Sequence, residues 1–163
     1  MSTEKDRQYL AAGVPQLQNY LLSGQLYYPL SMRLPQLTLG GILLSLKRMG
    51  TRAAVFEAQV EEVRSKWRSA WEAKSSREVR ARSELWMNYL SEYRDAPKAG
   101  ARLYPQNVRY RAMITLLGKI EDDSDAFTKS VFQDGDFIWE AECAPNFERE
   151  TFWYLFGTLK EQP

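Results

Sequence analysis

The side chains whose type and spacing best suit chemistry are carboxylates clustered in the last third of the chain. They are Asp122, Asp123, Asp125, Asp134, Asp136, Glu140 and Glu142. Oxygen ligands of this kind bind hard cations, and two neighbouring carboxyl groups can act as an acid and a base. An EF-hand loop beginning at Asp123 fails, because Phe127 would fill its fifth position and Thr128 the sixth, where glycine is needed. Capping and solvation of turns is the simpler role for such residues, and we expect neither a bound metal nor a cofactor.

Other chemistry is limited by the residues that the sequence lacks. Histidine is absent, which removes the commonest general base at neutral pH and the commonest zinc ligand. Cys143 is the single cysteine, so no disulfide forms within the chain and a reducing compartment is expected. No glycine-rich phosphate-binding motif occurs. We therefore lean against an enzyme and keep a histidine-free carboxylate enzyme, using a divalent cation, as an alternative hypothesis.

Basic residues follow one another through the middle of the chain, with Trp67 and Trp71 among them. They are Arg64, Lys66, Arg68, Lys74, Arg77, Arg80 and Arg82. Basic groups interleaved with aromatic rings can hold phosphates and stack bases, so nucleic-acid binding is a further alternative. Glutamates dilute this charge, and aromatic residues at helical spacing more often belong to a core.

The charge is also distributed unevenly along the chain. Residues 1–120 hold 19 basic and 10 acidic residues, a net charge of +9, whereas residues 121–150 hold two basic and 10 acidic residues, a net charge of −8. We expect the acidic segment to pair with the basic helix of the same chain.

The element that carries the basic residues is a run of 46 residues, Thr51 to Ala96, without glycine or proline. Apolar residues keep one helical phase along it from Phe56 to Tyr89. The pattern predicts one very long, possibly bent helix over about residues 52–95. As a straight helix it would extend roughly 70 Å, more than the diameter of about 40 Å that a compact chain of this length has.

The centre of this predicted helix is charged, and Lys74 and Glu78 lie on the line of its apolar stripe. Ser75 and Glu78 have the spacing of a capping box, which would start a new helix there and create a hairpin. No glycine, proline or asparagine supplies a turn, and the order Glu78 to Arg82 supports continuity through a favourable i,i+4 pair. The favoured interpretation is a continuous helix with a charged centre that the protein's own core leaves uncovered.

The remaining segments predict shorter elements. Thr38 can cap a helix that ends at Gly50, within which Gly40 and Gly41 allow another helix to approach closely. A basic loop is expected from Lys98 to Asn107, followed by a helix. Residues 147–156 suit a helix or a strand, and the tail after Gly157 is expected to lack structure. The predicted fold class is mainly all-α, with a less regular C-terminal segment that contains a short strand.

These observations favour a single-domain, non-enzymatic protein-interaction or assembly protein over residues 1–163. Its partner would be another protein or a second copy, bound through the long helix. The candidate partner-binding residues are Lys74, Arg77, Glu78, Arg80, Arg82 and Trp86. No apolar run is long enough to span a membrane, so we expect no membrane partner and a cytoplasmic protein.

Overall fold

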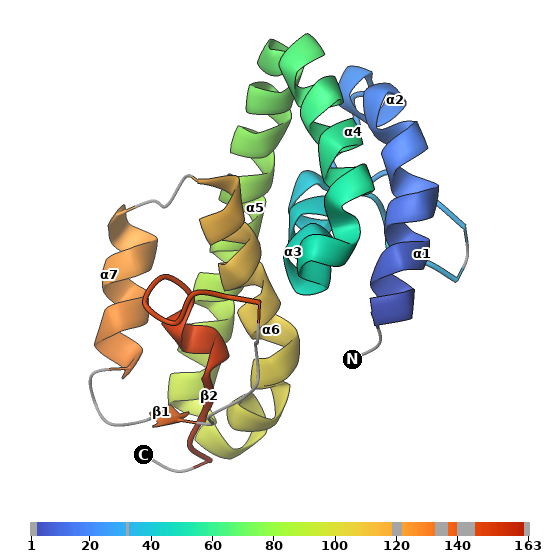
Figure 1. The fold of residues 1–163 in the computed structure, drawn as a ribbon. Coiled ribbons are helices and arrows are strands. Elements are labelled where there is room, and N and C mark those ends of the chain that lie inside the picture. The colour runs from blue at the N-terminus through green and yellow to red at the C-terminus, as the bar shows by residue number, and fades with distance from the viewer. Residues whose placement is uncertain (1–2, 32, 119–121, 133–136, 140–145, 162–163) are drawn as a thin grey trace. The chain divides into compact units, whose positions relative to one another are not determined.

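The computed structural model describes residues 3–31, 33–118, 122–132, 137–139 and 146–161 (Figure 1). Its elements divide into two compact units, which are described separately. Unit 1 is Met1–Glu78 and unit 2 is Val79–Pro163. The prediction of one domain over residues 1–163 stays a prediction.

The described elements are mostly helical, which confirms the mainly all-α fold class. In chain order they are α1 (Thr3–Gly13), η1 (Val14–Gln16), α2 (Leu17–Leu22), α3 (Leu39–Met49), η2 (Gly50–Ala53), α4 (Ala54–Lys66), α5 (Arg68–Asp95), α6 (Pro97–Leu117), α7 (Asp122–Val131), β1 (Phe137–Trp139), η4 (Trp153–Leu155) and β2 (Gly157–Leu159).

The core of unit 1 forms where α1 and α3 pack together. The Thr38 side chain accepts a hydrogen bond from the Gly41 amide at 2.9 Å, and α3 ends at Gly50, as predicted. A Cβ at Gly41 would lie only 2.4 Å from the Tyr9 hydroxyl of α1. The predicted close approach of another helix to this glycine is therefore confirmed.

The long helix predicted over residues 52–95 is interrupted at Trp67, where φ is −116° and ψ is 44°. Figure 1 shows α4 and the first turns of α5 diverging from this point. The long helix is present as α5, but residues 54–66 form the separate helix α4, and the chain turns back between the two (Figure 1). This turn lies before residues 72–84, which are helical throughout. The interruption allows Val60 of α4 and Trp71 of α5 both to be buried in unit 1. A straight helix would carry these two residues about 16 Å apart along one axis.

The residues of α5 that are buried recur every three or four positions, which is the spacing of one helical face. They are Trp71, Lys74, Ser75, Glu78, Val79, Arg82, Ser83, Trp86, Tyr89, Leu90 and Tyr93. The first half of α5, residues 68–78, belongs to unit 1 and the second half to unit 2. One helical face therefore contributes to both cores.

In unit 2, α6 corrects the prediction of a basic loop from Lys98 to Asn107. The helix begins at Pro97 and contains Pro105. A proline inside a helix costs about 3 kcal/mol, and a glycine about 1 kcal/mol. Gly100 lets α6 approach α5, since a Cβ there would lie 2.8 Å from the Tyr93 Cα. Burial of Ala101, Tyr104 and Val108 offsets the poor helix propensity, and Tyr104 contacts the rings of Trp86 and Tyr89 on α5.

The C-terminal segment also differs from the predictions. Residues 147–156 form turns and the short η4 instead of a helix, and the tail after Gly157 contains β2. This strand pairs antiparallel with β1, so that Phe137 lies opposite Leu159. Tyr104 donates to the Tyr154 carbonyl and Tyr93 donates to the Lys160 carbonyl at 2.7 Å. These long-range bonds order a tail that has little local pattern of its own.

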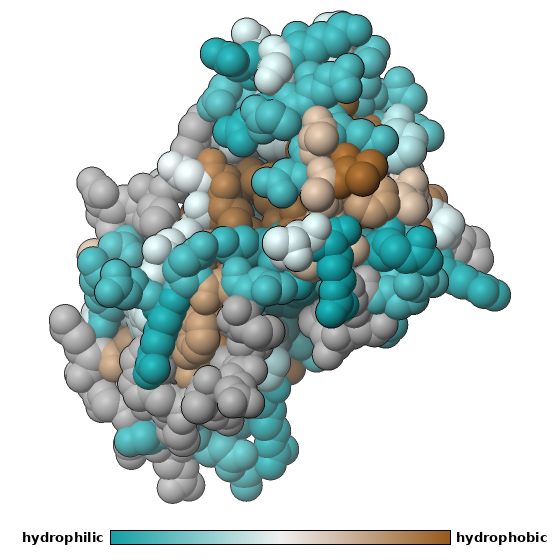
Figure 2. Space-filling model, viewed as in Figure 1, coloured by the Kyte–Doolittle hydropathy of each residue, from teal (hydrophilic) through white to brown (hydrophobic). Residues whose placement is uncertain are grey.

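The visible face over the upper end of α4 is mostly hydrophilic (Figure 2). Most of the α4 side chains there are exposed, including Glu57, Glu61 and Glu62. Among the residues that the structure describes, every helix is too short or too polar to cross a bilayer.

Candidate functional site

The six predicted partner-binding residues all lie on α5, but their environments differ. Lys74, Glu78, Arg82 and Trp86 are buried, whereas Arg77 and Arg80 are exposed. The expectation that the protein leaves Lys74 and Glu78 uncovered is therefore wrong, because unit 1 covers both. Of the six residues, only Arg77 in unit 1 and Arg80 in unit 2 present their charges at the surface.

Lys74 is held by the loop that follows α2. Its side chain is 3% exposed, and its ammonium donates to the main-chain oxygens of Ser23 at 2.8 Å and Gln25 at 2.6 Å. The ammonium also lies 4.6 Å from the centre of the Tyr20 ring, a distance suited to a cation–π contact. Burial, followed by the charge of Arg77, lowers the pKa of Lys74. The side chain fastens a loop inside unit 1.

Glu78 is fully buried at the start of α3. Its carboxylate accepts from the Gly40 amide, with oxygen–nitrogen distances of 2.9 Å and 3.1 Å. The N-terminus of a helix carries partial positive charge and unpaired amides, so it stabilises an anion there. The capping box, which was the less favoured alternative, does not form: residues 72–84 are helical throughout, as expected, and Glu78 bonds to another helix. Its carboxylate joins α5 to α3.

The other four candidates divide into two buried and two exposed residues. Trp86 is fully buried, donates to the Thr128 hydroxyl at 2.7 Å and stacks on Tyr89. The Arg82 guanidinium lies 5.4 Å from the centre of the Tyr110 ring. Exposed Arg77 donates to the Gly24 carbonyl at 3.2 Å. Arg80 forms no described bond, and it lines a pocket.

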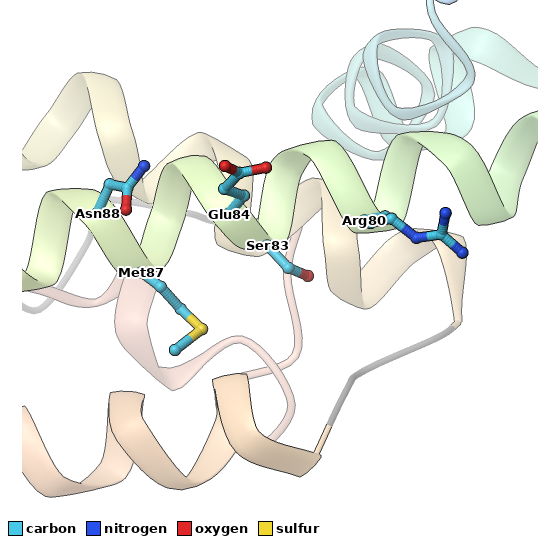
Figure 3. A pocket seen from close by; sticks show the side chains of 5 residues that line it. All are labelled: Arg80, Ser83, Glu84, Met87 and Asn88. Carbon is cyan, nitrogen blue, oxygen red and sulfur yellow. The ribbon is translucent and has the colours of Figure 1, made fainter.

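This pocket lies in unit 2 and has a volume of about 340 Å³. It is lined by Arg80, Ser83, Glu84, Met87 and Asn88 of α5. In Figure 3, Ser83 and Met87 leave the helix on one side, while Glu84 and Asn88 leave it on the other.

Ser83 distinguishes the pocket from an ordinary surface hollow. Its side chain is 3% exposed, and its hydroxyl oxygen is buried without a hydrogen-bond partner in the described structure. Leaving a buried hydroxyl unpaired costs about 1–3 kcal/mol. This oxygen is closed to solvent, so an incoming group reaches it only if the Ser83 side chain changes rotamer.

The sequence analysis missed four of the five pocket residues because it assigned the helical face by apolar residues alone. Ser83 lies on the buried face of α5, whereas Leu85, which belonged to the predicted apolar stripe, is exposed. The lining residues have the spacing i, i+3, i+4, i+7 and i+8, so they span an arc of about 140° around α5, with Ser83 and Met87 towards one edge and Glu84 and Asn88 towards the other. That spacing indicates that the five residues lie near one another on the helix. Because most of them are polar, the spacing does not appear as an apolar stripe.

The acidic segment contributes one well-defined ion pair. Asp125 accepts from buried Arg111 at 3.1 Å and pairs with Lys129 at 3.0 Å. Residues 134, 136, 140 and 142 of the proposed metal site lie outside the described residues, and the side chains of residues 122 and 123 are also not described. Within the described part of the chain, no three carboxylate or cysteine residues are grouped as a metal site requires.

A second polar cluster surrounds Arg111 on α6. Its guanidinium donates to the Thr115 hydroxyl at 2.7 Å and lies 4.9 Å from the centre of the Tyr154 ring. Burial raises the pKa of Tyr154 to about 12. This raised value leaves the phenol protonated at neutral pH, which suits a structural hydrogen bond better than acid–base catalysis.

The two tryptophans of the proposed nucleic-acid surface have partners within unit 1. Trp71 is 2% exposed, and the Arg64 guanidinium lies 5.0 Å from the centre of its ring. The Lys66 ammonium lies 5.7 Å from the centre of the Trp67 ring. These cations and rings contact one another, so the Trp71 face is unavailable for stacking a base.

Comparison of the chain with protein-family models, curated proteins and solved structures finds no match.

Proposed function

We propose that this protein is a non-catalytic binding protein that holds a partner protein on the second half of α5. The contact surface is the pocket lined by Arg80, Ser83, Glu84, Met87 and Asn88. The observation that supports the proposal is the unpartnered, buried hydroxyl of Ser83 at a pocket with exposed charged residues. A partner that turns the Ser83 side chain outward and bonds to its hydroxyl would relieve a cost that the isolated chain bears.

Two further features favour binding over catalysis. The sequence has no histidine, and the described acidic side chain of Asp125 is already paired with Arg111 and Lys129. The pocket instead combines one flexible thioether with hydrogen-bonding groups, a mixture that suits a protein contact.

The proposal is tested by recovering partners from a native lysate of the source cells. Tagged wild-type protein is compared with the double variant Arg80→Ala and Asn88→Ala. The matched control is Arg109→Ala with Gln106→Ala, which removes similar exposed side chains from α6 of the same unit. We expect a partner that the wild type and control retain and that the pocket variant loses.

The same proteins recovered with all three baits would contradict the proposal. Measurement of the mass in solution at several concentrations identifies the case in which the partner is a second copy. In that case the wild type and control form a dimer, whereas the pocket variant remains monomeric.

A further inference from the structure

The exposed side of α5 carries a regularly spaced row of side chains, named here the outer seam. Its members are Arg77, Ala81, Glu84, Asn88, Ser91 and Asp95. Their positions advance in alternating steps of four and three, which keeps them within an arc of about 80° around the helix. These are the steps with which one helix packs along another. Ala81 is partly exposed, and the other five side chains are exposed.

The outer seam is complementary to itself when a second copy of α5 runs antiparallel to the first. With a two-fold axis beside Trp86, residues equally far along the helix on either side of the axis face each other. Arg77 then lies opposite Asp95 of the second copy, so opposite charges meet. Glu84 lies opposite Asn88 of the second copy, whose amide can donate to a carboxylate. Because the arrangement is symmetric, each of these pairs forms twice.

The side chains nearer the axis suit close contact between the two helices. Ala81 lies opposite Ser91 of the second copy, and these small side chains allow the axes to approach to the separation of about 8–10 Å that packed helices have. Leu85, which is 40% exposed, lies beside the outer seam at one position from the axis, so it faces its own copy. Contact between the two leucines removes apolar surface from water.

The distribution of charge along α5 favours the antiparallel direction. Arg77 and Arg80 lie towards one end of the exposed side, whereas Glu92 and Asp95 lie towards the other. An antiparallel pair places the basic end of each copy against the acidic end of the other. A parallel pair would bring like charges together and would be repelled. This charge complementarity selects a second copy as the occupant.

The groups of the outer seam are available for these contacts. Arg77 uses one N–H for the Gly24 carbonyl at 3.2 Å, and its guanidinium has further donors. Glu84, Asn88 and Asp95 form no side-chain hydrogen bond or ion pair within the part of the chain that the structure describes. Docking therefore replaces water at these groups without breaking an internal pair.

We propose that a second copy of this chain docks antiparallel on the outer seam, through pairs of Arg77 with Asp95 and of Glu84 with Asn88. This inference rests on the proposed function and identifies the partner that α5 holds. Glu84 and Asn88 also line the pocket and leave α5 on the same side of it (Figure 3). The second copy thus covers one edge of the pocket.

The test is sedimentation equilibrium of the full-length protein from about 10 µM to about 1 mM at low salt. The wild type should form a dimer with a dissociation constant on the order of 100 µM, because exposed ion pairs each contribute little. Raising the salt concentration to about 0.5 M should weaken the dimer several-fold, since salt screens exposed charges. A wild type that stays monomeric over the whole range would overturn the inference.

Charge reversal tests the pairing itself. Arg77→Asp alone and Asp95→Arg alone each place like charges opposite one another, so the dissociation constant should rise about ten-fold or more. The double variant exchanges the two charges and should return to within about three-fold of the wild type. Arg109→Asp changes the net charge equally at an exposed site of α6 and should dimerise as the wild type does.

The melting temperature of each variant, measured where the wild type is monomeric, separates loss of the fold from loss of docking. Leu85→Gln changes no charge and tests the axis if a reversed variant is unstable. It should weaken the dimer several-fold at an unchanged melting temperature. Dimerisation that is unaffected by Leu85→Gln and by both single reversals would overturn the inference. Stable single variants whose dimer the double variant fails to restore would also overturn it.

The lysate experiment separates this inference from the proposed function. A monomeric wild type, together with a different protein whose recovery depends on Arg80 and Asn88, would overturn docking of a second copy and leave the proposed function standing. Identical recovery with all three baits, together with a dimer that the double reversal restores, would overturn the pocket as the contact surface and retain the outer seam.

Discussion

The two halves of α5 solve the problem of burial in opposite ways. Residues 68–78 bury the charges of Lys74 and Glu78, whereas residues 79–95 bury the rings of Trp86, Tyr89 and Tyr93. The charged half relies on main-chain oxygens and an amide placed by distant segments, and the aromatic half relies mainly on packing area. The difference shows that a helical face can remain buried even when its residue types alternate between charged and apolar.

The contrast also explains why Lys74 and Glu78, which were predicted to bind a partner, are buried. Charges on the line of an apolar stripe suggested an uncovered centre, yet buried charge is tolerated where hydrogen bonds replace water. Lys74 donates hydrogen bonds to two main-chain carbonyls, and the Glu78 carboxylate accepts one from an amide at the N-terminus of α3. Within residues 79–95, the partner surface that we propose lies beside the buried face of α5, where Arg80 is exposed.

The largest expected effect is on the aromatic side of this comparison. Replacing Trp86 by alanine should lower the free energy of unfolding by about 3–5 kcal/mol, because a fully buried ring and its bond to Thr128 are lost. Chemical denaturation measures the change. Trp86→Phe retains a ring and should cost less, and a loss below about 1 kcal/mol in Trp86→Ala would contradict burial of this residue.

On the charged side, Lys74→Met should destabilise the protein by about 2–3 kcal/mol. The methionine retains much of the aliphatic volume but leaves the carbonyls of Ser23 and Gln25 without their donor. Denaturation of the purified protein, with no partner present, is the appropriate measurement. Stability equal to that of the wild type would mean that the ammonium is not held internally.

High pH should change the free energy of unfolding through titratable groups in both units, beginning with Tyr154 in unit 2. Burial raises the pKa of Tyr154 in unit 2 from 10 to about 12, so between these values the unfolded chain releases a proton that the folded chain retains. Stability is therefore lost as the pH rises, by about 1 kcal/mol at pH 11 for this group. Comparison of wild type with Tyr154→Phe at pH 9 and pH 11 isolates the effect, which an identical pH dependence would exclude.

Lys74 should respond to pH with the opposite sign. Burial lowers its pKa below the ordinary value of 10.5, so the unfolded chain holds the proton more tightly than the folded chain. Stability from this group rises as the pH passes through the folded pKa towards 10.5. Lys74→Met should remove that increment, and denaturation curves collected across this range would detect its loss.

The smallest expected effect comes from Arg77, which donates to the same loop as Lys74 but is exposed. Arg77→Ala should change the free energy of unfolding by less than about 0.5 kcal/mol, because water can replace the lost bond. A loss as large as that of Lys74→Met would indicate that burial does not distinguish the two residues.

Local patterns predicted the parts of the fold that local chemistry determines. The Thr38 cap, the stop at Gly50, the close approach at Gly41 and the helicity of residues 72–84 all follow from neighbouring residues. The break at Trp67 and the continuation of α6 through Pro105 depend on tertiary packing that overrides propensity. The strand after Gly157 depends on a partner strand far away in the sequence.

The candidate site was predicted less well, because residue type alone does not show which polar side chains are covered. Arg80 was named, whereas Ser83, Glu84, Met87 and Asn88 were hidden by their mixed polarity. The buried face of α5 recurs every three or four residues from Trp71 to Tyr93. Ser83 lies on this face and is buried, whereas Arg80 lies off it and is exposed.

The most direct test of the contrast within α5 labels the lysines of the unmodified protein. Acetylation of the folded chain with an amine-reactive ester, followed by peptide mass spectrometry, reports the accessibility of each ammonium. Lys74 is 3% exposed, whereas Lys66 and Lys129 are exposed. The account predicts that Lys74 reacts much more slowly than these two and becomes equally reactive in denaturant. Equal rates in the folded protein would contradict the burial of the charged half of α5.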